Sequence, residues 1–393
     1  AALVSSFAFA PGSPAASQAV QFTDTSTGNP TSWSWNFGDG ATSAAQHPSH
    51  TYGGPGTFAV SLTAANAGGS ATATRSLVVA AAEPPGSANP TVLLGRPTDV
   101  SVAASLMAAS GTDLYLEYGT APGVYAGRTP SSTVPGNDPV VVEMSGLRAD
   151  TRYYYRARYR LPSEPDYRAG AEHTFVTKRL SGRAFTFVVQ ADPHLDGNSS
   201  PEVYRQALAN QLADQPDFLI DLGDDSMVDK CAIDGSTLCA QPSPATADTV
   251  RARHALMRSY FDLACHSIPL FMVLGNHDGE AGWQRGNGVD SLDAWSLRTR
   301  RALFLNPEPD AFYSGSADVA PGIGLRQNYY AFEWGDALFV VLDPYTYTSP
   351  KPGADSWGWT LGPTQYRWLA ETLAASRARF KFVFTHHLVG GNG

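Results

Sequence analysis

The hydrophobic pattern of this chain changes close to residue 180, and that change constrains the fold more than any other feature. Before it, apolar residues recur at every second position in short runs between Gly, Pro, Ser and Asn clusters. After it, apolar runs of strand length alternate with stretches of helical spacing. The first pattern is typical of β-sandwiches and the second of βαβ units. We therefore predict an all-β N-terminal part followed by an α/β domain.

Size, charge and hydropathy exclude several classes of protein. With 393 residues, the chain is long enough for two or three separately packed domains. Only 16% of the residues are charged and 43% are hydrophobic, which excludes a disordered tail and a long helical rod. The net charge of -9 argues against nucleic acid as a partner. No run approaches the roughly 18 apolar residues of a membrane helix, so we expect no membrane span.

The N-terminus and the cysteines bear on the location of the protein. The chain opens at Ala1 without the basic and apolar segments of a signal peptide, which fits a mature secreted or cell-surface protein whose signal has been removed. Three cysteines are too few for a disulfide scaffold. Cys231 and Cys239 are close enough in sequence to form a bridge or can stay free, whereas Cys265 is expected to be a buried small hydrophobe.

Residues 1–82 are predicted to form the first β-sandwich. The run Trp35-Asn36-Phe37-Gly38-Asp39-Gly40 places aromatic residues on a strand that leads into a tight turn, and Tyr52 with Gly56 follows. These patterns resemble the Trp-x-Phe-Gly-Asp-Gly and Tyr-x-x-x-Gly patterns of PKD domains, which are immunoglobulin-like modules common on secreted and cell-surface proteins. The resemblance allows a polysaccharide or cell-surface partner, although we expect the motif residues themselves to be core and turn.

Residues 83–90 are a predicted linker rich in Pro, Gly, Ser and Ala, and residues 91–178 form a second predicted β-sandwich. The alternation of Tyr and Arg in Tyr153–Arg160 predicts one buried and one solvated strand face. The run Gly146–Arg156 resembles a corner of fibronectin type III-like domains. It is similar in particular to the version that precedes the catalytic domain of purple acid phosphatases.

Apolar strands of the third domain, residues 183–393, are followed by residues of the types that serve as metal ligands. In open α/β sheets, ligands bind at the ends of the strands. Imidazole, amide and carboxylate groups together suit Zn, Mn or Fe and do not suit Ca. The strands and the residues after them are Phe185–Gln190 with Asp192 and His194, Phe218–Leu222 with Asp224 and Asp225, Leu270–Leu274 with Asn276, His277 and Asp278, and Phe380–Phe384 with His386 and His387.

The order of these motifs resembles the calcineurin-like metallophosphoesterase superfamily, whose signature is Asp-x-His, Gly-Asp, Gly-Asn-His-(Asp/Glu), a later His, and Gly-His-x-His. Stretches around Tyr329 and Gln365 are similar to purple acid phosphatase-type enzymes. The resemblance implies a central β-sandwich flanked by helices and two divalent or mixed-valence transition metal ions, Fe, Zn or Mn. It implies that Asp192 and His194 hold the first ion, that Asp224 bridges, and that Asn276 and His386 hold the second.

The resemblance also implies the catalytic roles. His277 would face the substrate and donate a proton to the leaving oxygen or stabilise negative charge, and Asp278 would orient its ring. Two ions about 3.5 to 4 Å apart can turn a water into a hydroxide that attacks the phosphate. Asp221 and Asp225 are expected to be hydrogen-bonding neighbours, and His387 an outer residue of its loop.

The sequence departs from the purple acid phosphatase pattern in two ways. Met227 stands where those enzymes have a tyrosine that binds the ferric ion, and His194 stands where they have glycine, so no purple chromophore is expected. No Gly-His-x-His occurs either. We therefore expect a C-terminally incomplete α/β domain, because the given sequence ends at Gly393 before this motif; a partial site of reduced metal affinity is the alternative.

The sequence thus predicts a secreted, metal-dependent phosphoesterase that hydrolyses phosphate monoesters. The alternatives are an extracellular adhesion or structural protein with a degenerate phosphoesterase domain, and a phosphodiesterase. The insert between Met227 and Val250 either overhangs the metal cleft or is a tolerated surface insertion. The later tryptophans either line the cleft or, as we expect by default, serve packing: Trp283, Trp295, Trp357 and Trp359.

Overall fold

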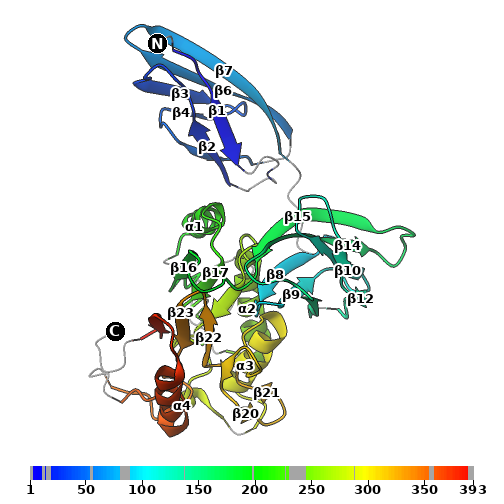
Figure 1. Cartoon of the computed structure of the whole chain (residues 1–393), viewed down its shortest axis with the longest axis vertical. Coiled ribbons are helices and arrows are strands. Elements are labelled where there is room, and N and C mark those ends of the chain that lie inside the picture. Colours follow the sequence, from blue (N-terminus) through cyan, green and yellow to red (C-terminus); the bar gives the residue numbers. More distant parts are fainter. Residues whose placement is uncertain are drawn as a thin grey trace. The chain divides into compact units, whose positions relative to one another are not determined.

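A computed structural model describes residues 3–10, 14, 19–53, 56–79, 89–136, 138–196, 199–225, 227–229, 245–286, 288–353 and 358–387. The chain forms two compact units, Ala1–Ser87 and Ala88–Gly393 (Figure 1). Several predicted features lie outside the described residues: most of the linker 83–90, most of the insert after Met227 with Cys231 and Cys239, Trp357, and the segment that ends at Gly393.

The first unit is a β-sandwich. One sheet has the order β1-β2-β5, and the other has the order β4-β3-β6-β7. Trp35 and Phe22, from opposite sheets, are buried in the core between them. At the predicted turn, Gly38 has a φ of +86°, and a Cβ there would lie 2.9 Å from the backbone of Ala59, so glycine is required. The strands are β1 (Phe7–Ala10), β2 (Ala19–Asp24), β3 (Ser32–Asn36), β4 (Thr42–Ser43), β5 (Ser49–Thr51), β6 (Gly56–Asn66) and β7 (Gly69–Val79).

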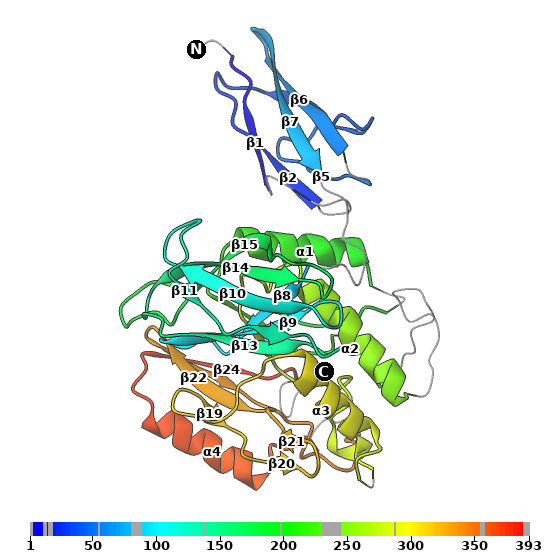
Figure 2. The ribbon, with the colours of Figure 1, turned by 90° about the vertical axis from the view of Figure 1, so that its right-hand side faces the viewer.

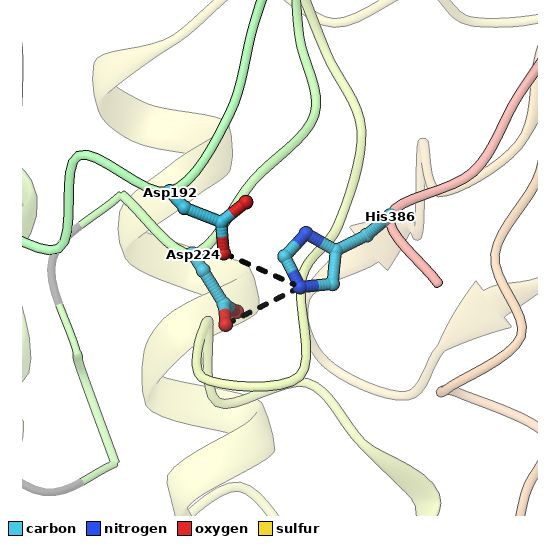
Figure 3. A group of neighbouring side chains, drawn as sticks. All are labelled: Asp192, Asp224 and His386. Atoms are coloured by element: carbon cyan, nitrogen blue, oxygen red, sulfur yellow. Dashed lines mark ion pairs between the residues drawn. The ribbon is translucent and has the colours of Figure 1, made fainter. Parts of the chain in front are cut away.

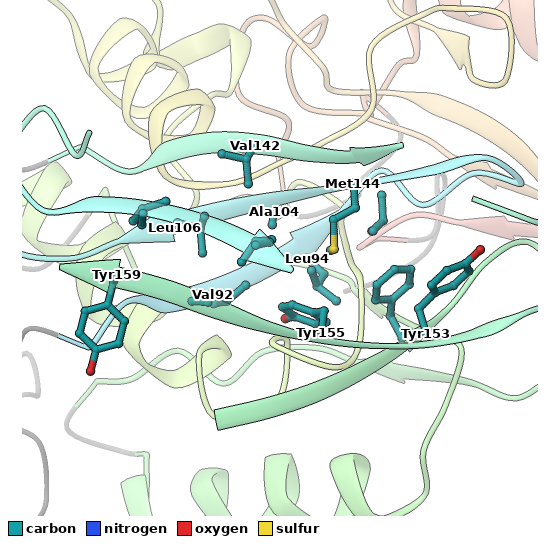
Figure 4. Packing of buried hydrophobic residues seen from close by; sticks show 14 of the residues in the cluster. Val92, Leu94, Ala104, Leu106, Val142, Met144, Tyr153, Tyr155 and Tyr159 are labelled. Carbon is teal, nitrogen blue, oxygen red and sulfur yellow. The ribbon is translucent and has the colours of Figure 1, made fainter. Parts of the chain in front are cut away.

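The second unit begins with another β-sandwich, whose core is shown in Figure 4. One sheet has the order β13-β9-β8 and the other β11-β10-β14-β15, with β12 also paired to β10. Along β14 every second residue is buried, which confirms the predicted alternation of buried Tyr and solvated Arg. The strands are β8 (Thr91–Gly95), β9 (Ser101–Met107), β10 (Asp113–Gly119), β11 (Gly127–Arg128), β12 (Ser132–Thr133), β13 (Val140–Ser145), β14 (Arg152–Arg160) and β15 (Arg168–Val176).

The α/β part stacks two further sheets. A parallel sheet has the order β16-β17-β18, and a mixed sheet has the order β19-β22-β23-β24. Their facing sides share an aromatic core that includes Phe218 and Phe339. The strands are β16 (Phe187–Gln190), β17 (Phe218–Asp221), β18 (Leu270–Met272), β19 (Ser314–Gly315), β22 (Tyr330–Trp334), β23 (Ala337–Val341), β24 (Phe380–Phe384), and the separate pair β20 (Val319–Ala320) and β21 (Gly324–Leu325).

Helices cover the outer faces of both sheets, as predicted. Residues of α1 and α2 pack against the parallel sheet, and residues of α4 pack against the mixed sheet. Figure 2 shows α4 on the side of β22 and β24. The predicted antiparallel pair around Gly335 is β22 with β23, and the predicted last strand is β24. The helices are α1 (Pro201–Ala213), α2 (Ala247–Phe261), the 3-10 turn η1 (Gly282–Gln284), α3 (Leu292–Leu303) and α4 (Gly362–Ala375).

The second sandwich is joined firmly to the α/β part. The buried Arg258 on α2 donates hydrogen bonds of 2.9 Å to both the side chain and the carbonyl of Ser105 on β9. The hydroxyl of Tyr155 donates to the carbonyl of His266 at 2.5 Å, and the Leu94 N–H donates to the carbonyl of Cys265 at 2.9 Å. Cys265 itself is buried and free, as predicted. Among the described residues, no helix has the length and apolar character needed to cross a bilayer.

Candidate metal centre

Three predicted ligands meet where strands of the two stacked sheets end. Asp192 follows β16, Asp224 follows β17, and His386 follows β24. One ligand atom from each of them lies within 4.8 Å of the others (Figure 3). Because β24 belongs to the mixed sheet and the other two strands to the parallel sheet, the stacking of the sheets brings the three side chains together.

The distances leave room for a cation between these groups. His386 Nε2 lies 3.3 Å from Asp224 Oδ2 and 3.9 Å from Asp192 Oδ1. His194 Nε2 lies 3.4 Å from Asp192 Oδ1 and 3.8 Å from Asp224 Oδ2. Asp224 and His386 have side chains only 4% and 3% exposed, whereas Asp192 is 51% exposed. The site is therefore closed on the side of Asp224 and open on the side of Asp192.

His194 supplies the strongest sign that the donor set fits a metal. Its Nε2 atom is buried and has no hydrogen-bond partner in the described part of the chain. A buried polar atom without a partner is costly, and an imidazole nitrogen facing two carboxylates can be satisfied by a cation. The mixed nitrogen and oxygen donors are those that transition metals accept.

The backbone at this site is held in unusual conformations. Asp192, His194 and Asp224 have φ values of 57°, 52° and 56°, in the left-handed region that such residues rarely adopt. Hydrogen bonds lock the loops together: the Asp192 N–H donates to the Gly223 carbonyl and the His194 N–H to the Asp224 carbonyl, each at 3.1 Å. Backbone strain thus concentrates at the residues that present the ligands.

Two glycines allow the loops after β17 and β18 to touch. A Cβ at Gly223 would lie 2.4 Å from the backbone nitrogen of Gly275, and Gly223 has a φ of +92°. A Cβ at Gly275 would lie 2.2 Å from Asp224 Oδ1. A larger residue at Gly275 would displace Asp224, and one at Gly223 would push the two loops apart, so both positions require glycine.

Hydrogen bonds orient the ligand atoms. His386 Nδ1 lies 3.0 Å from the carbonyl of Leu222; with its proton on Nδ1, the ring donates to this carbonyl and keeps Nε2 for a metal. Asp224 Oδ1 accepts the backbone N–H of His277 at 2.7 Å, and its Oδ2 faces the two imidazoles. Asp224 is therefore central to the cluster, where a bridging ligand is expected.

The charges of this cluster favour a cation. Burial alone would raise the pKa of Asp224, but the hydrogen bond and charge of His386 outweigh it and leave the pKa lowered. Burial alone would lower the pKa of His386, yet Asp224 and then Asp192 raise it to about 9. A proton on His386 thus balances part of the negative charge of the carboxylates. A bound metal ion would take the place of that proton.

The predicted partner of His277 is corrected by the structure. The partner of His277 Nδ1 is Asp229 Oδ1, at 2.8 Å, where the sequence predicted Asp278. Asp278 is buried and instead accepts the backbone N–H of Gly275 at 2.7 Å and that of Asp224 at 3.3 Å. Burial and the charge of Asp224 raise the pKa of Asp278 to about 7. Asp278 thus holds the loop beneath Asp224 and does not orient the ring, because these backbone donors take its carboxylate.

The other predicted residues lie around the centre. Asn276 is half-buried in the turn after β18, and in the described part of the chain its side chain makes no hydrogen bond to the predicted ligands. Asp221 is buried and accepts the Gly223 N–H at 2.9 Å; burial raises the pKa of Asp221 and of Asp225. Both act as neighbours of the site, as predicted. His387 lies beside His386, with ring centroids 4.6 Å apart.

Sequence reasoning missed two residues that support the site. Asp229 carries no motif, since it lies beyond the Gly-Asp pair in an irregular turn. Arg253 is buried on α2 and donates to the carbonyls of His194, at 3.2 Å, and Leu195, at 3.0 Å. An arginine on the buried side of an amphipathic helix was a signal that could have indicated such a role, because a buried charge needs partners.

Comparison with known protein families decides the relationship of the chain. The family model described as calcineurin-like phosphoesterase matches residues 185–393, and that of the PKD domain matches residues 8–81. The chain belongs to the calcineurin-like phosphoesterase family. The family implies divalent metal ions, so the cluster around Asp224 is the natural place for them.

One solved structure supports the predicted fold class. A purple acid phosphatase isolated from yellow lupin (Lupinus luteus) seeds matches 97% of this chain and 72% of its own chain, with 12% identity and a TM-score of 0.52. The PKD1 domain of the Vibrio cholerae metalloprotease PrtV matches 20% of this chain and 99% of its own, with 30% identity and a TM-score of 0.19. No curated protein matches the chain. The predicted family and fold class are confirmed, while the fibronectin type III likeness stays a prediction.

Proposed function

We propose that this phosphoesterase is an extracellular enzyme that hydrolyses phosphate monoesters with two bound transition metal ions, Fe, Zn or Mn. One observation carries the proposal: Asp192, Asp224 and His386 converge within 4.8 Å beside the Nε2 of His194, a buried atom that makes no hydrogen bond with the described residues. An adhesion protein with a degenerate domain would have no need for charged side chains as buried as Asp224 and His386 at this position.

We assign the ligand roles from the family resemblance, and the convergence of Asp192, Asp224 and His386 supports them. Asp192 and His194 would hold the first ion, Asp224 would lie between the ions, and Asn276 and His386 would hold the second. When bound, such a pair of ions acidifies water and neutralises charge on phosphate oxygens. The open side at Asp192 gives a substrate its approach.

His277 is proposed as the general acid. Asp229 accepts a hydrogen bond from its Nδ1 and so orients the ring, and the Nε2 side would donate a proton to the leaving oxygen. The His277 ring lies 6.3 Å from that of His194, so it is close enough to the ligand cluster to face a bound ester. Asp278 supports this chemistry indirectly, through the backbone of Gly275 and Asp224.

The test compares two esters and two variants. We expect metal-dependent release of p-nitrophenol from p-nitrophenyl phosphate, slower release from bis(p-nitrophenyl) phosphate, and near two transition metals per chain by elemental analysis. Asp224→Asn should lose at least about 100-fold in activity, whereas Asp248→Asn, on the exposed start of α2, should retain it. Absence of metal after metal-supplemented purification would favour the adhesion or structural alternative, and faster diester hydrolysis the phosphodiesterase.

We also propose the domain organisation and location. The domains would be a PKD domain at 1–82, a linker at 83–90, a fibronectin type III-like sandwich at 91–178 and the phosphoesterase at 183–393. PKD domains are typical of extracellular proteins, which supports secretion and a polysaccharide or cell-surface partner for the first domain. Detection of the protein in the medium of the producing cells tests the location.

A further inference from the structure

An aromatic wall, formed by Trp283, Tyr345 and Trp359, lies beside the candidate metal centre. The ring centroids of Trp283 and Trp359 are 5.3 Å apart, and those of Tyr345 and Trp359 are 5.2 Å apart. The planes meet at 64° and 85°, the edge-to-face arrangement that fixes aromatic rings against one another. The wall is therefore a rigid surface.

The wall adjoins the proposed ligands. The Tyr345 ring lies 6.0 Å from that of His386, and the Trp359 ring lies 5.7 Å from that of His387. At its other end, Trp283 precedes Gln284, whose side chain donates to Asp229 at 3.3 Å. Since Asp229 binds His277, the wall reaches from a proposed metal ligand to the residue network of the proposed general acid.

Packing alone does not explain the wall. Tyr345 is only 1% exposed, but Trp283 and Trp359 are half-buried and keep part of their surface at the solvent. The exposed Lys351 places its ammonium 5.7 Å from the centroid of Trp283, which shows that this ring face meets the solvent boundary. Half-buried aromatic surface beside a polar centre is the kind of surface on which ligands stack.

We propose that the aromatic wall binds the planar aromatic leaving group of the phosphate ester, either an aryl group or a nucleobase; this rests on the proposed function. With the phosphate at the metal centre, a leaving group would extend over Trp283 and Trp359. Stacking on such rings depends on the π-face and not on a hydrogen-bond pattern, so it favours aromatic over aliphatic esters without requiring one particular ring.

The test measures kcat/KM for phenyl phosphate, AMP and glycerol 2-phosphate. Trp283→Ala and Trp359→Ala should lower the value for an aromatic ester by roughly 10-fold or more and change that for glycerol 2-phosphate by less than about twofold. A lower kcat/KM for AMP alone identifies a site for nucleobases. A lower kcat/KM for phenyl phosphate alone identifies a site for aryl groups. The control is Trp295→Ala on α3, a half-buried tryptophan bound to Asp290 at 2.9 Å, which should not change selectivity.

Two outcomes separate the inference from the proposed function. Equal losses on aromatic and aliphatic esters, or no loss, would overturn the wall as a binding surface while leaving the phosphoesterase intact. If the wild type hydrolyses none of the three esters, the proposed function fails, and binding then tests the wall. AMP should quench the tryptophan fluorescence of the wild type and Trp295→Ala, and not of the Trp283→Ala, Trp359→Ala double variant; an unchanged signal in all of them would refute the wall.

Discussion

Nδ1 of His277 is hydrogen-bonded to Oδ1 of Asp229 at 2.8 Å, which joins the turn after β18 to the turn after β17. Gln284 holds the second oxygen of this carboxylate at 3.3 Å. The pair resembles the acid and orienting carboxylate of many hydrolytic sites, in which the carboxylate stabilises the charged ring. The contribution of this pair to the rate can be distinguished from that of the metal ligands by comparing esters whose leaving groups differ in their need for a proton.

Asp229→Asn keeps the shape of this contact but removes the charge. We expect the rate for glycerol 2-phosphate to fall on the order of 100-fold, because an alkoxide needs a proton to leave. The rate for p-nitrophenyl phosphate should fall far less, since its phenolate leaves without one. Steady-state rates for both esters provide the measurement, with Asp290→Asn as the control. Equal losses on the two esters would contradict a role in proton donation.

Gly275→Ala tests the close approach of two loops. The new Cβ would lie 2.2 Å from Asp224 Oδ1, so Asp224 must move away from the cluster. We expect reduced metal content by elemental analysis and at least about 10-fold lower activity, with a loss of stability of about 1 to 3 kcal/mol. Gly170→Ala is the matched control, because its nearest atom lies at 3.5 Å, an ordinary contact. Wild-type metal content in Gly275→Ala would show that Asp224 tolerates the crowding.

Glu280→Ala tests a buried ion pair. We expect its loss to cost more stability than the loss of an ion pair on the surface. Arg300 Nε and Nη2 bind the two oxygens of Glu280 at 2.5 and 3.0 Å, and the side chains are 2% and 1% exposed. Removing Glu280 leaves a buried charge without its carboxylate, which should cost about 3 to 5 kcal/mol in the free energy of unfolding. Asp138→Ala, which breaks the solvent-exposed pair with Arg251, should cost less than about 1 kcal/mol. Urea unfolding of both variants measures the difference, and similar costs would show that burial does not matter here.

Two neighbouring histidines predict a loss of stability at acidic pH. His173 on β15 and His266 before β18 have ring centroids 4.1 Å apart. Burial, opposed in part by the charge of Glu172, lowers the pKa of His173 to about 4, and burial together with His173 lowers that of His266 to about 3. Below pH 6.5 these histidines therefore bind protons in the unfolded chain but not in the folded chain. The free energy of unfolding should be highest above pH 6.5 and should fall as the pH drops toward 4.

The slope of this loss is at most about 1.4 kcal/mol per pH unit for each histidine. Thermal unfolding between pH 8 and 4.5 should show a smaller loss for the His173→Gln, His266→Gln double variant than for the wild type. The two proteins need not have equal stability at pH 8, because only the dependence on pH is compared. If the unfolding temperatures of the two proteins fall in parallel across this pH range, these histidines are not the source of the loss.

Several features of the site were already determined by the order of residues along the chain. Asp192, Asp224 and His386 each follow an apolar strand, and the structure brings them together. The pattern succeeded because a strand's period of two and its abrupt end are local properties of the backbone, and the strand ends of stacked sheets meet at shared edges. The same local rule predicted the alternation in β14 and the final strand β24.

The sequence by itself determined the two β-sandwiches, the α/β part, the family and the residue types at the strand ends. Only the tertiary structure decided that Asp229, and not the adjacent Asp278, pairs with His277, that Gly275 must stay small, and that Trp283 and Trp359 form one wall. These relationships join turns from separate elements. No period along the chain encodes them, because they depend on how the two sheets stack and how closely their loops approach.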